Sequence, residues 1–99
     1  MDAKKERYKR IRGAILKMLA YEHPRPVDSN VIHLLLDDLR YSVTEEECQS
    51  HITYLAEKGF LHRECRKGSG VKLEMVTISP AGLDVLDGFV QDVGVDTRF

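Results

Sequence analysis

The chain has 99 residues, of which 42% are hydrophobic and 31% are charged, and its formal net charge is −1. This length predicts one domain with a modest core, and the periodic placement of the apolar residues excludes a wholly disordered chain. No apolar stretch is long enough to span a bilayer, and the basic N-terminus lacks the apolar segment of a signal peptide. Because the 2 cysteines occur without a secretory signal, we expect a cytoplasmic protein with reduced thiols.

The small net charge hides a strong segregation of charge along the chain. Residues 1–17 and 58–72 are rich in Lys and Arg, whereas residues 22–57 and 73–99 are rich in Asp and Glu. Local charge, and not the net charge, therefore decides which partners each segment can attract.

A first helix is predicted from about Ala3 to about Tyr21, because its apolar residues recur at helical spacing. Those residues are Tyr8, Ile11, Ile15, Met18 and Leu19. Positive charge in the first turns opposes the helix dipole. These turns therefore either form a solvated basic end that frays or meet an anionic partner.

Pro24 and Pro26 end the first helix, and residues 25–27 are extended and can form a short edge strand. Asp28 or Ser29 then caps a second helix. We expect this second helix to be covered on more than one side, because its apolar stripe is wide. The stripe consists of Val31, Ile32, Leu34, Leu35, Leu36 and Leu39.

The third helix, residues 44–58, has the clearest boundaries. Thr44 and Glu47 form a capping box, in which each side chain accepts a hydrogen bond from the other residue's backbone N–H. Gly59 can adopt the left-handed conformation that ends a helix. The residues at core spacing are Cys48, Ile52 and Leu55. Because only a short turn separates the second and third helices, the pair is expected to form a helix-turn-helix.

A two-stranded hairpin is predicted after Gly59. Residues 60–65 form its first strand, residues 66–70 a glycine-containing loop, and residues 71–79 the return strand. The apolar alternation of the return strand changes phase between Met75 and Val76. This change predicts either a β-bulge at that point or apolar contacts on both faces of the strand.

Ser79 is expected to cap a last helix that has Pro80 at its first position. Its expected core residues are Leu83, Leu86 and Val90, with Val85 and Phe89 beside them. Gly82 is costly inside a helix unless close packing requires it, and the first helix is the expected neighbour. Residues 1–90 thus form the domain and residues 91–99 a flexible tail, whose apolar residues can dock on a partner: Val93, Val95 and Phe99.

The order of these elements in residues 10–90 is that of the winged helix-turn-helix family. Three segments are also typical of that family: residues 55–61, the glycine-containing wing, and residues 77–83. More narrowly, residues 14–19, 82–85 and 93–95 resemble small winged-helix proteins of Mu-like phages and prophages. The resemblance implies an α+β, mainly helical fold, namely a winged helix-turn-helix with a two-stranded wing and an added C-terminal helix. It also implies a DNA-binding protein, and in particular a transcriptional regulator of a phage or prophage.

In a helix-turn-helix the second helix enters the major groove. Here that is the helix at residues 44–58, and the wing is expected on the DNA backbone. The side chains of this helix that suit base edges or phosphates are Gln49, Ser50, Thr53 and Tyr54. Basic residues of the wing and of the N-terminal arm are expected to contact phosphates. They are Arg66, Lys67, Lys72, Lys4, Lys5 and Arg7.

Three acids at the start of the same helix, Glu45, Glu46 and Glu47, fit double-stranded DNA poorly, because a duplex is strongly negative. They indicate an alternative function: a non-enzymatic adaptor that binds a basic protein partner through this acidic face. A third interpretation is a solvated helix start whose acids interact favourably with the helix dipole.

Ligand types suited to zinc occur at Cys48-x-x-His51 and at His62-x-x-Cys65. The second pair lies on a strand, where this spacing sends the side chains to opposite faces, and Cys48 belongs to the core stripe. We therefore predict no metal site and no cofactor. The sequence has no nucleophile elbow, phosphate loop or paired-carboxylate motif, so we predict no enzymatic activity.

A homodimer is predicted because the first and last helices carry more apolar residues than one buried side needs. The additional residues are Leu16, Val85 and Phe89. A two-fold dimer buries such a patch on both subunits and presents two copies of the third helix to successive DNA half-sites.

Overall fold

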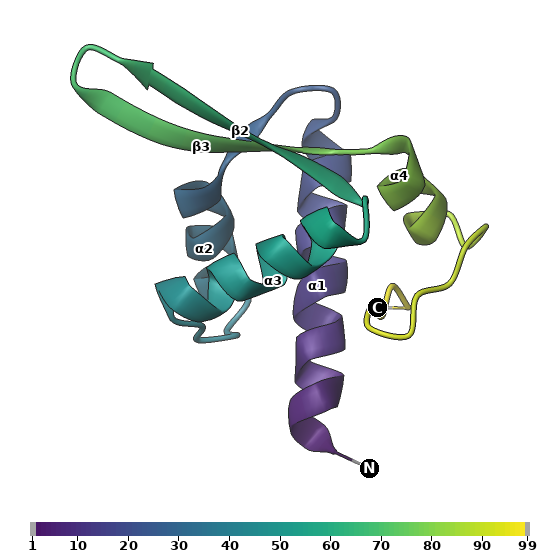
Figure 1. Cartoon of the computed structure of the whole chain (residues 1–99). Coiled ribbons are helices and arrows are strands. Elements are labelled where there is room, and N and C mark those ends of the chain that lie inside the picture. Colours follow the sequence, from purple (N-terminus) through teal and green to yellow (C-terminus); the bar gives the residue numbers. More distant parts are fainter. Residues whose placement is uncertain (1, 99) are drawn as a thin grey trace.

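The structure is a computed structural model and describes residues 2–98 of the chain. At its centre lies α1 (Ala3–Glu22), a long helix against which the other elements pack (Figure 1). Asp2 caps α1 by accepting a hydrogen bond from the backbone N–H of Lys4 at 2.9 Å. Its core residues are Ile11, Ala14, Ile15, Leu16 and Leu19. Because Leu16 is fully buried, it is not one of the surplus apolar residues that a dimer would have to cover.

Two further helices, α2 (Ser29–Asp38) and α3 (Glu45–Glu57), confirm the predicted helix-turn-helix. Asp28 caps α2, and its carboxylate accepts a hydrogen bond from the backbone N–H of Asn30 at 2.8 Å. The turn between the helices passes through Arg40 and Ser42, whose φ angles are 69° and 49°. These left-handed residues reverse the chain within a short distance and bring α3 against α1.

The prediction that α2 is covered on more than one side is wrong. Ile32 and Leu36 are buried, but the other apolar residues of the stripe have exposed fractions between 37% and 63%. They are Val31, Leu34, Leu35 and Leu39. Only the side of α2 that faces α1, α3 and the sheet is covered, because a domain of this size has no further layer for the other side.

The predicted capping box of α3 is half formed. The Thr44 hydroxyl accepts a hydrogen bond from the backbone N–H of Glu47 at 3.0 Å. The carboxylate of Glu47, however, accepts a hydrogen bond from Arg7 on α1 and not from Thr44. Arg7 therefore binds the carboxylate of Glu47, which was predicted to complete the cap of α3. The rest of the prediction is confirmed, since Gly59 ends the segment with a φ angle of 78° and the predicted core face is buried.

The sheet consists of β1 (Val27–Asp28), β2 (Leu61–Gly68) and β3 (Val71–Ile78). Its order is β1–β3–β2, and both pairs are antiparallel. β1 is the predicted short edge strand, and it pairs with β3 through Val27 and Val76. The sheet therefore joins the segment before α2 to the wing.

The hairpin is tighter than predicted, because Ser69 and Gly70 alone form its turn. Their φ angles are 49° and 78°, and two consecutive left-handed residues make the kind of two-residue turn that matches the twist of a hairpin. Residues 66–68 consequently belong to β2 and not to the loop.

The predicted bulge in β3 is absent. Strand pairing runs without interruption from Leu61 opposite Ile78 to Gly68 opposite Val71. The phase change instead separates the two faces of β3. One face carries the buried Val76 and Ile78, and the other carries the half-buried Leu73 and Met75.

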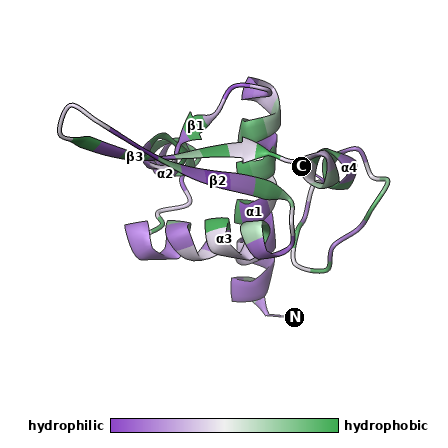
Figure 2. Ribbon diagram, turned by 45° about the horizontal axis from the view of Figure 1, so that its top comes forward, coloured by the Kyte–Doolittle hydropathy of each residue, from purple (hydrophilic) through white to green (hydrophobic). Residues whose placement is uncertain are grey.

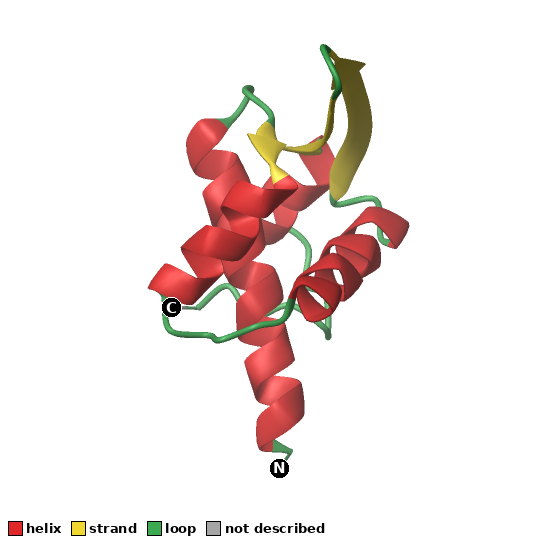
Figure 3. Ribbon diagram, turned by 90° about the vertical axis from the view of Figure 1, so that its left-hand side faces the viewer, coloured by secondary structure: helices red, strands yellow, loops and turns green. Residues whose placement is uncertain are grey.

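The outer part of the β2–β3 ribbon, the wing, extends away from the helices (Figures 1 and 3). Every residue from His62 to Lys72 is exposed. Figure 2 shows that β2 is hydrophilic over most of its length and becomes hydrophobic where it joins the core. The wing is thus a polar arm anchored at one end, and residues 66–72 are called the wing tip below.

The last helix, α4 (Pro80–Leu86), is shorter than predicted. Ser79 caps it by accepting a hydrogen bond from the backbone N–H of Gly82 at 3.1 Å. Its buried residues are Gly82 and Val85, the expected core residues Leu83 and Leu86 are half-buried, and Val90, the third expected core residue, is 48% exposed. The reason is that the helix ends before Gly88, which has a φ angle of 82°, so Val90 no longer follows the helical spacing.

Gly82 confirms the expected close packing but with a different neighbour. A Cβ atom at this position would overlap the backbone carbonyl oxygen of Phe60 and approach the Ile78 side chain to 2.8 Å. The glycine therefore fits α4 against the start of β2 and the end of β3, and not against α1 as predicted.

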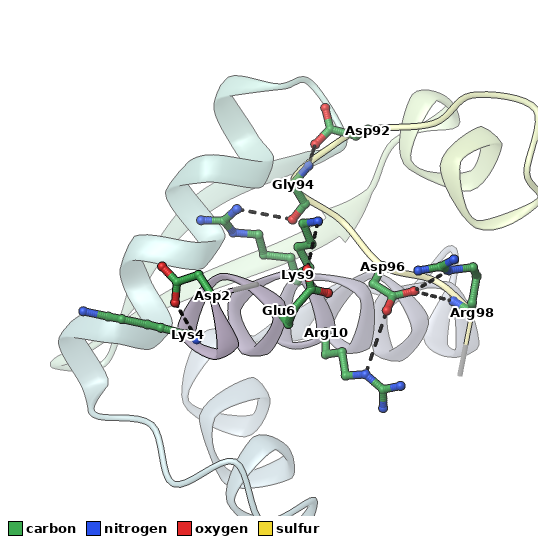
Figure 4. Close-up of polar contacts among 10 residues, drawn as sticks. Asp2, Lys4, Glu6, Lys9, Arg10, Asp92, Gly94, Asp96 and Arg98 are labelled. Carbon is green, nitrogen blue, oxygen red and sulfur yellow. Dashed lines mark hydrogen bonds and ion pairs between the residues drawn. The ribbon is translucent and has the colours of Figure 1, made fainter.

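Residues 91–98, called the C-terminal strap below, lie along α1 and α3 (Figure 4). The Tyr54 hydroxyl donates a hydrogen bond to the Asp92 carboxylate at 2.7 Å. Arg12 donates to the carbonyl oxygen of Gly94 at 3.2 Å. A side chain at Gly94 would overlap the Tyr54 hydroxyl, so this close approach requires glycine. The flexibility predicted for residues 91–99 stays a prediction, and Phe99 lies outside the described residues.

Asp96, the second acidic residue of the strap, is also fixed by contacts with α1. The backbone N–H of Asp96 donates to the carbonyl oxygen of Lys9 at 3.0 Å, and its carboxylate lies 3.8 Å from the Arg10 guanidinium. Hydrogen bonds from the backbone and side chain of Arg98 lower the pKa of Asp96.

Of the helices in residues 2–98, none has both the length and the apolar character that crossing a membrane requires.

Candidate nucleic-acid interface

The exposed side of α3 faces the inner part of the wing, and Arg63 of β2 connects the two. Its guanidinium donates hydrogen bonds to the Thr53 hydroxyl and to the Gln49 side-chain oxygen, each at 2.9 Å. It also binds the Glu74 carboxylate of β3 at 3.0 Å. Two of the predicted DNA-contacting residues, Gln49 and Thr53, are thus brought together, and the residue that does so was missed.

Ser50, the third predicted residue on this side of α3, is exposed and lies between Gln49 and Thr53 in the chain. Glu45 and Glu46 are also exposed, one turn closer to the start of α3. The exposed side of α3 therefore has two chemically different parts, acids at its beginning and neutral hydrogen-bonding groups in its middle.

Tyr54 is turned away from this group. Its ring lies under the Arg12 guanidinium, 3.8 Å from the ring centroid. Burial and the hydrogen bond to Asp92 raise the pKa of the Tyr54 hydroxyl. Its hydroxyl is therefore held within the protein, and we leave Tyr54 out of the candidate interface.

The wing tip carries the predicted cations Arg66, Lys67 and Lys72, all exposed. Lys67 and Lys72 lie directly opposite each other in the β2–β3 pairing. Arg66 approaches the Glu64 carboxylate at 3.5 Å, with both side chains mostly exposed. Such an exposed ion pair contributes little. The wing tip is therefore a concentrated positive charge at the end of an extended arm.

The cations of the N-terminal arm differ in their contacts within the protein, and the Lys4 ammonium lies 5.8 Å from the centroid of the Tyr8 ring. Lys4 and Lys5 are exposed. Arg7 instead donates to the Glu47 carboxylate and to the backbone carbonyl oxygen of Tyr41. This ion pair neutralises both charges and connects α1 to α3. Arg7 was predicted to contact DNA, and Glu47 was predicted to contact a protein partner.

Cys48 and His51, which the sequence offers as zinc ligands, are both buried in the core. Burial raises the pKa of the Cys48 thiol to about 11. Burial and the nearby Arg12 cation lower the pKa of His51 to about 4. His51 Nδ1 accepts a hydrogen bond from Arg12 Nε at 3.2 Å. In the described part of the chain, no three His, Cys, Asp or Glu side chains are grouped as metal ligands would be.

Comparison with known proteins bears on the fold. No family model and no curated protein sequence matches the chain. One solved structure with a similar fold is that of Bacillus subtilis PadR in complex with operator DNA. The TM-score is 0.61 at 16% sequence identity, and the match covers 89% of this chain and 52% of that one. The fold of this protein is therefore a winged helix, and the chain spans about half the length of the protein it matches.

Proposed function

We propose that this protein is a DNA-binding winged-helix regulator of transcription that places α3 in the major groove and the wing on the phosphate backbone. The observation that carries the proposal is the wing tip. Lys67 and Lys72 lie directly opposite each other on an antiparallel pair, where like charges are destabilising. A polyanion such as duplex DNA would relieve this repulsion, and the lysines would favour binding by displacing counterions from its phosphates.

Two further observations support the same function. Gln49, Ser50 and Thr53 present neutral hydrogen-bonding groups on α3, the element that enters the major groove in a helix-turn-helix. The PadR structure, which shares the fold, contains operator DNA. We assign Lys4 and Lys5 to additional phosphate contacts, and we place the regulator in the cytoplasm of a phage-infected or prophage-carrying cell.

The test is an electrophoretic shift series with random-sequence duplex DNA at two salt concentrations. We expect binding that weakens steeply as salt rises, because the wing and arm cations displace counterions from phosphates. Absence of binding at low salt, or binding that is insensitive to salt, would contradict the proposal. A single-stranded DNA of the same length controls for nonspecific attraction to a polyanion.

We further propose that the regulator acts as a homodimer joined through the region after α4. Phe89 is 79% exposed, and Val90 and Val93 are also exposed, so a second copy has apolar side chains to cover in this region. Phe89→Asp should give a folded monomer, because Phe89 lies outside the core. Leu34→Asp, on the exposed side of α2, is the matched control and should leave the dimer intact. Wild type that sediments as a monomer at high micromolar concentration would overturn this proposal, as would a Leu34→Asp variant that alone dissociates.

A second candidate function is a non-enzymatic adaptor that binds a basic protein. The observation that favours it is the exposure of Glu45 and Glu46 at the start of α3, in the position where a helix-turn-helix meets DNA. A partner with a basic surface would complement these acids and would associate faster because of them. Glu47 has a smaller part in this candidate, since it is already paired with Arg7.

A further inference from the structure

We propose that Arg63 sets the base preference of α3 by fixing the direction of the Gln49 amide, so that Gln49 selects guanine and not adenine. The inference rests on the proposed DNA-binding function and names the specificity of the same surface. It starts from a contact that joins three elements: Arg63 of β2 binds Gln49 of α3 and Glu74 of β3.

The polarity of this contact is unambiguous. A guanidinium has only donors, so the Gln49 atom that faces it at 2.9 Å is the side-chain oxygen. Arg63 itself is held from the other side, because the Glu74 carboxylate binds the same guanidinium nitrogen at 3.0 Å. The arginine is thus anchored on the wing, and the orientation of the Gln49 amide follows from the position of the wing.

The consequence for Gln49 is that both of its N–H donors remain for an external ligand, while its oxygen is turned toward Arg63 and has given one of its two lone pairs to that cation. A glutamine that selects adenine needs both groups, since the oxygen accepts from adenine N6 and the nitrogen donates to N7. Guanine instead presents two acceptors, N7 and O6, in the major groove. An amide whose oxygen is held toward Arg63, and whose donors are the groups left to meet a base, therefore favours guanine over adenine.

Thr53 adds to the same polarity. Its hydroxyl oxygen accepts the second Arg63 hydrogen bond at 2.9 Å, so the hydroxyl hydrogen is directed elsewhere and is free to donate. Both side chains that Arg63 holds by their oxygens therefore keep donors for another ligand. Hydrogen bonds in such a chain polarise one another and strengthen the outward donors.

The experiment is a selection of bound duplexes from a random library, followed by titration of matched duplexes that differ at one base pair. Gln49→Ala identifies the pair that Gln49 contacts, as the position at which preference disappears. Wild type should prefer guanine there, roughly tenfold over adenine, in the range of good side-chain–base contacts. Arg63→Ala frees the Gln49 oxygen and should move the preference at this pair to adenine.

Arg66→Ala is the matched control, because Arg66 lies on the same strand but its guanidinium is paired with Glu64 and not with α3. It should weaken binding to all sequences about equally and leave the guanine preference unchanged. A second variant covers the case in which Arg63→Ala does not fold. Gln49→Glu replaces the outward donors by acceptors and should abolish the guanine preference.

The outcomes separate the inference from the function on which it rests. If wild type binds duplexes but Arg63→Ala or Gln49→Glu keeps a guanine preference at the Gln49 pair, the inference is overturned and the DNA-binding function stands. If wild type prefers adenine at that pair, the inference is equally overturned. If wild type binds no duplex at low salt, both the function and the inference fail.

Discussion

The wing tip and the C-terminal strap are both short, charged segments at the end of a structural element, and the structure treats them in opposite ways. In the strap, Asp92 receives a hydrogen bond from Tyr54 and lies 3.4 Å from the Lys58 ammonium group. In the wing tip, Lys67 faces Lys72 across the hairpin. Charge in the strap thus stabilises the protein's own fold, whereas the side chains of the two wing-tip lysines make no hydrogen bond or ion pair with the described residues 2–98.

This difference teaches that the role of a charged segment depends on which residues the fold places beside it. The basic residues of α1 illustrate the point, because Arg12 is used by the strap and Arg7 by α3. Stability and DNA affinity should therefore respond to different sets of charged residues, and each of the following changes tests that separation.

The largest effect is expected when the wing tip loses its lysine pair. Lys67→Ala with Lys72→Ala should lower the affinity for all duplex sequences roughly tenfold at moderate salt and reduce the salt slope by about 2. The melting temperature should stay the same or rise, because a like-charge pair is removed. Lys58→Ala, which removes a lysine of the strap network, is the control and should leave DNA affinity unchanged. Equal affinity of the double variant and wild type would exclude the wing tip as a DNA contact.

The next effect concerns pH and the histidine beside the strap network. Folded His51 stays neutral down to its pKa of about 4, whereas the unfolded chain takes up the proton at the ordinary value of 6.5. Between these values the unfolded state binds more protons, so the free energy of unfolding should fall as pH decreases from 7.5 to 4.5. His51→Gln should remove up to roughly 3 kcal/mol of this fall.

Urea unfolding at several pH values measures the effect, and exposed His62 supplies the control. His62→Gln should keep the wild-type pH dependence, because His62 is exposed on β2 and lies outside the core in which His51 is buried. The pH range in which His51 affects stability is distinct from the range in which the strap acids do. The pKa of Asp92 is lowered, since the hydrogen bonds from Tyr54, Gly94 and Lys58 outweigh the effect of burial. Its contribution is therefore lost only at lower pH, as the folded carboxylate becomes protonated.

A smaller effect is expected from the strap hydrogen bond itself. Tyr54→Phe removes the donor to Asp92 and should lower the free energy of unfolding by about 1–2 kcal/mol. DNA affinity should not change, because the Tyr54 hydroxyl points into the strap. Tyr21→Phe is a fair control, since Tyr21 is 86% exposed and should be neutral. A loss of DNA affinity in Tyr54→Phe at unchanged stability would return Tyr54 to the DNA interface.

The smallest effect is expected from the acids at the start of α3. Glu45→Gln with Glu46→Gln removes two charges that repel phosphates, so duplex affinity should rise by roughly two- to fivefold at low salt. If a basic protein is the ligand, association with it should instead slow, because charges at the rim of an interface mainly set the encounter rate. Should neither ligand respond, this end of α3 is only solvated.

Much of the fold could be predicted from the sequence because its signals are local. The Thr44 cap, the Gly59 stop and the core spacing of Cys48 are each decided within a few neighbouring residues, and all are found in the structure. The core of α4 was misassigned because the helix ends early. The left-handed Gly88 takes Val90 out of the helical spacing and leaves it exposed, while Val85 inside the helix is the side chain that is buried.

The candidate site was harder to predict, because its contacts depend on how separate elements are placed. Arg63 stands in a run of charged residues on β2, and nothing in that run distinguishes the arginine that contacts Gln49. Only the strand register and the approach of the wing to α3 reveal it. The same holds for Asp92, whose partners Tyr54 and Lys58 lie far away in the chain.

The unbroken pairing from Leu61 to the two-residue turn gives the wing a fixed length. The position of the lysine pair relative to α3 is fixed by counting residues along two locked strands. Adding two residues to each strand would keep every side chain on its face and advance the pair by roughly 7 Å, since each strand residue rises about 3.3 Å. On DNA this is close to two base-pair steps of about 3.4 Å each. Under the proposed DNA-binding function, the length of the wing would set which phosphates the lysine pair reaches from a given base, and related chains with longer or shorter hairpins would reach different ones.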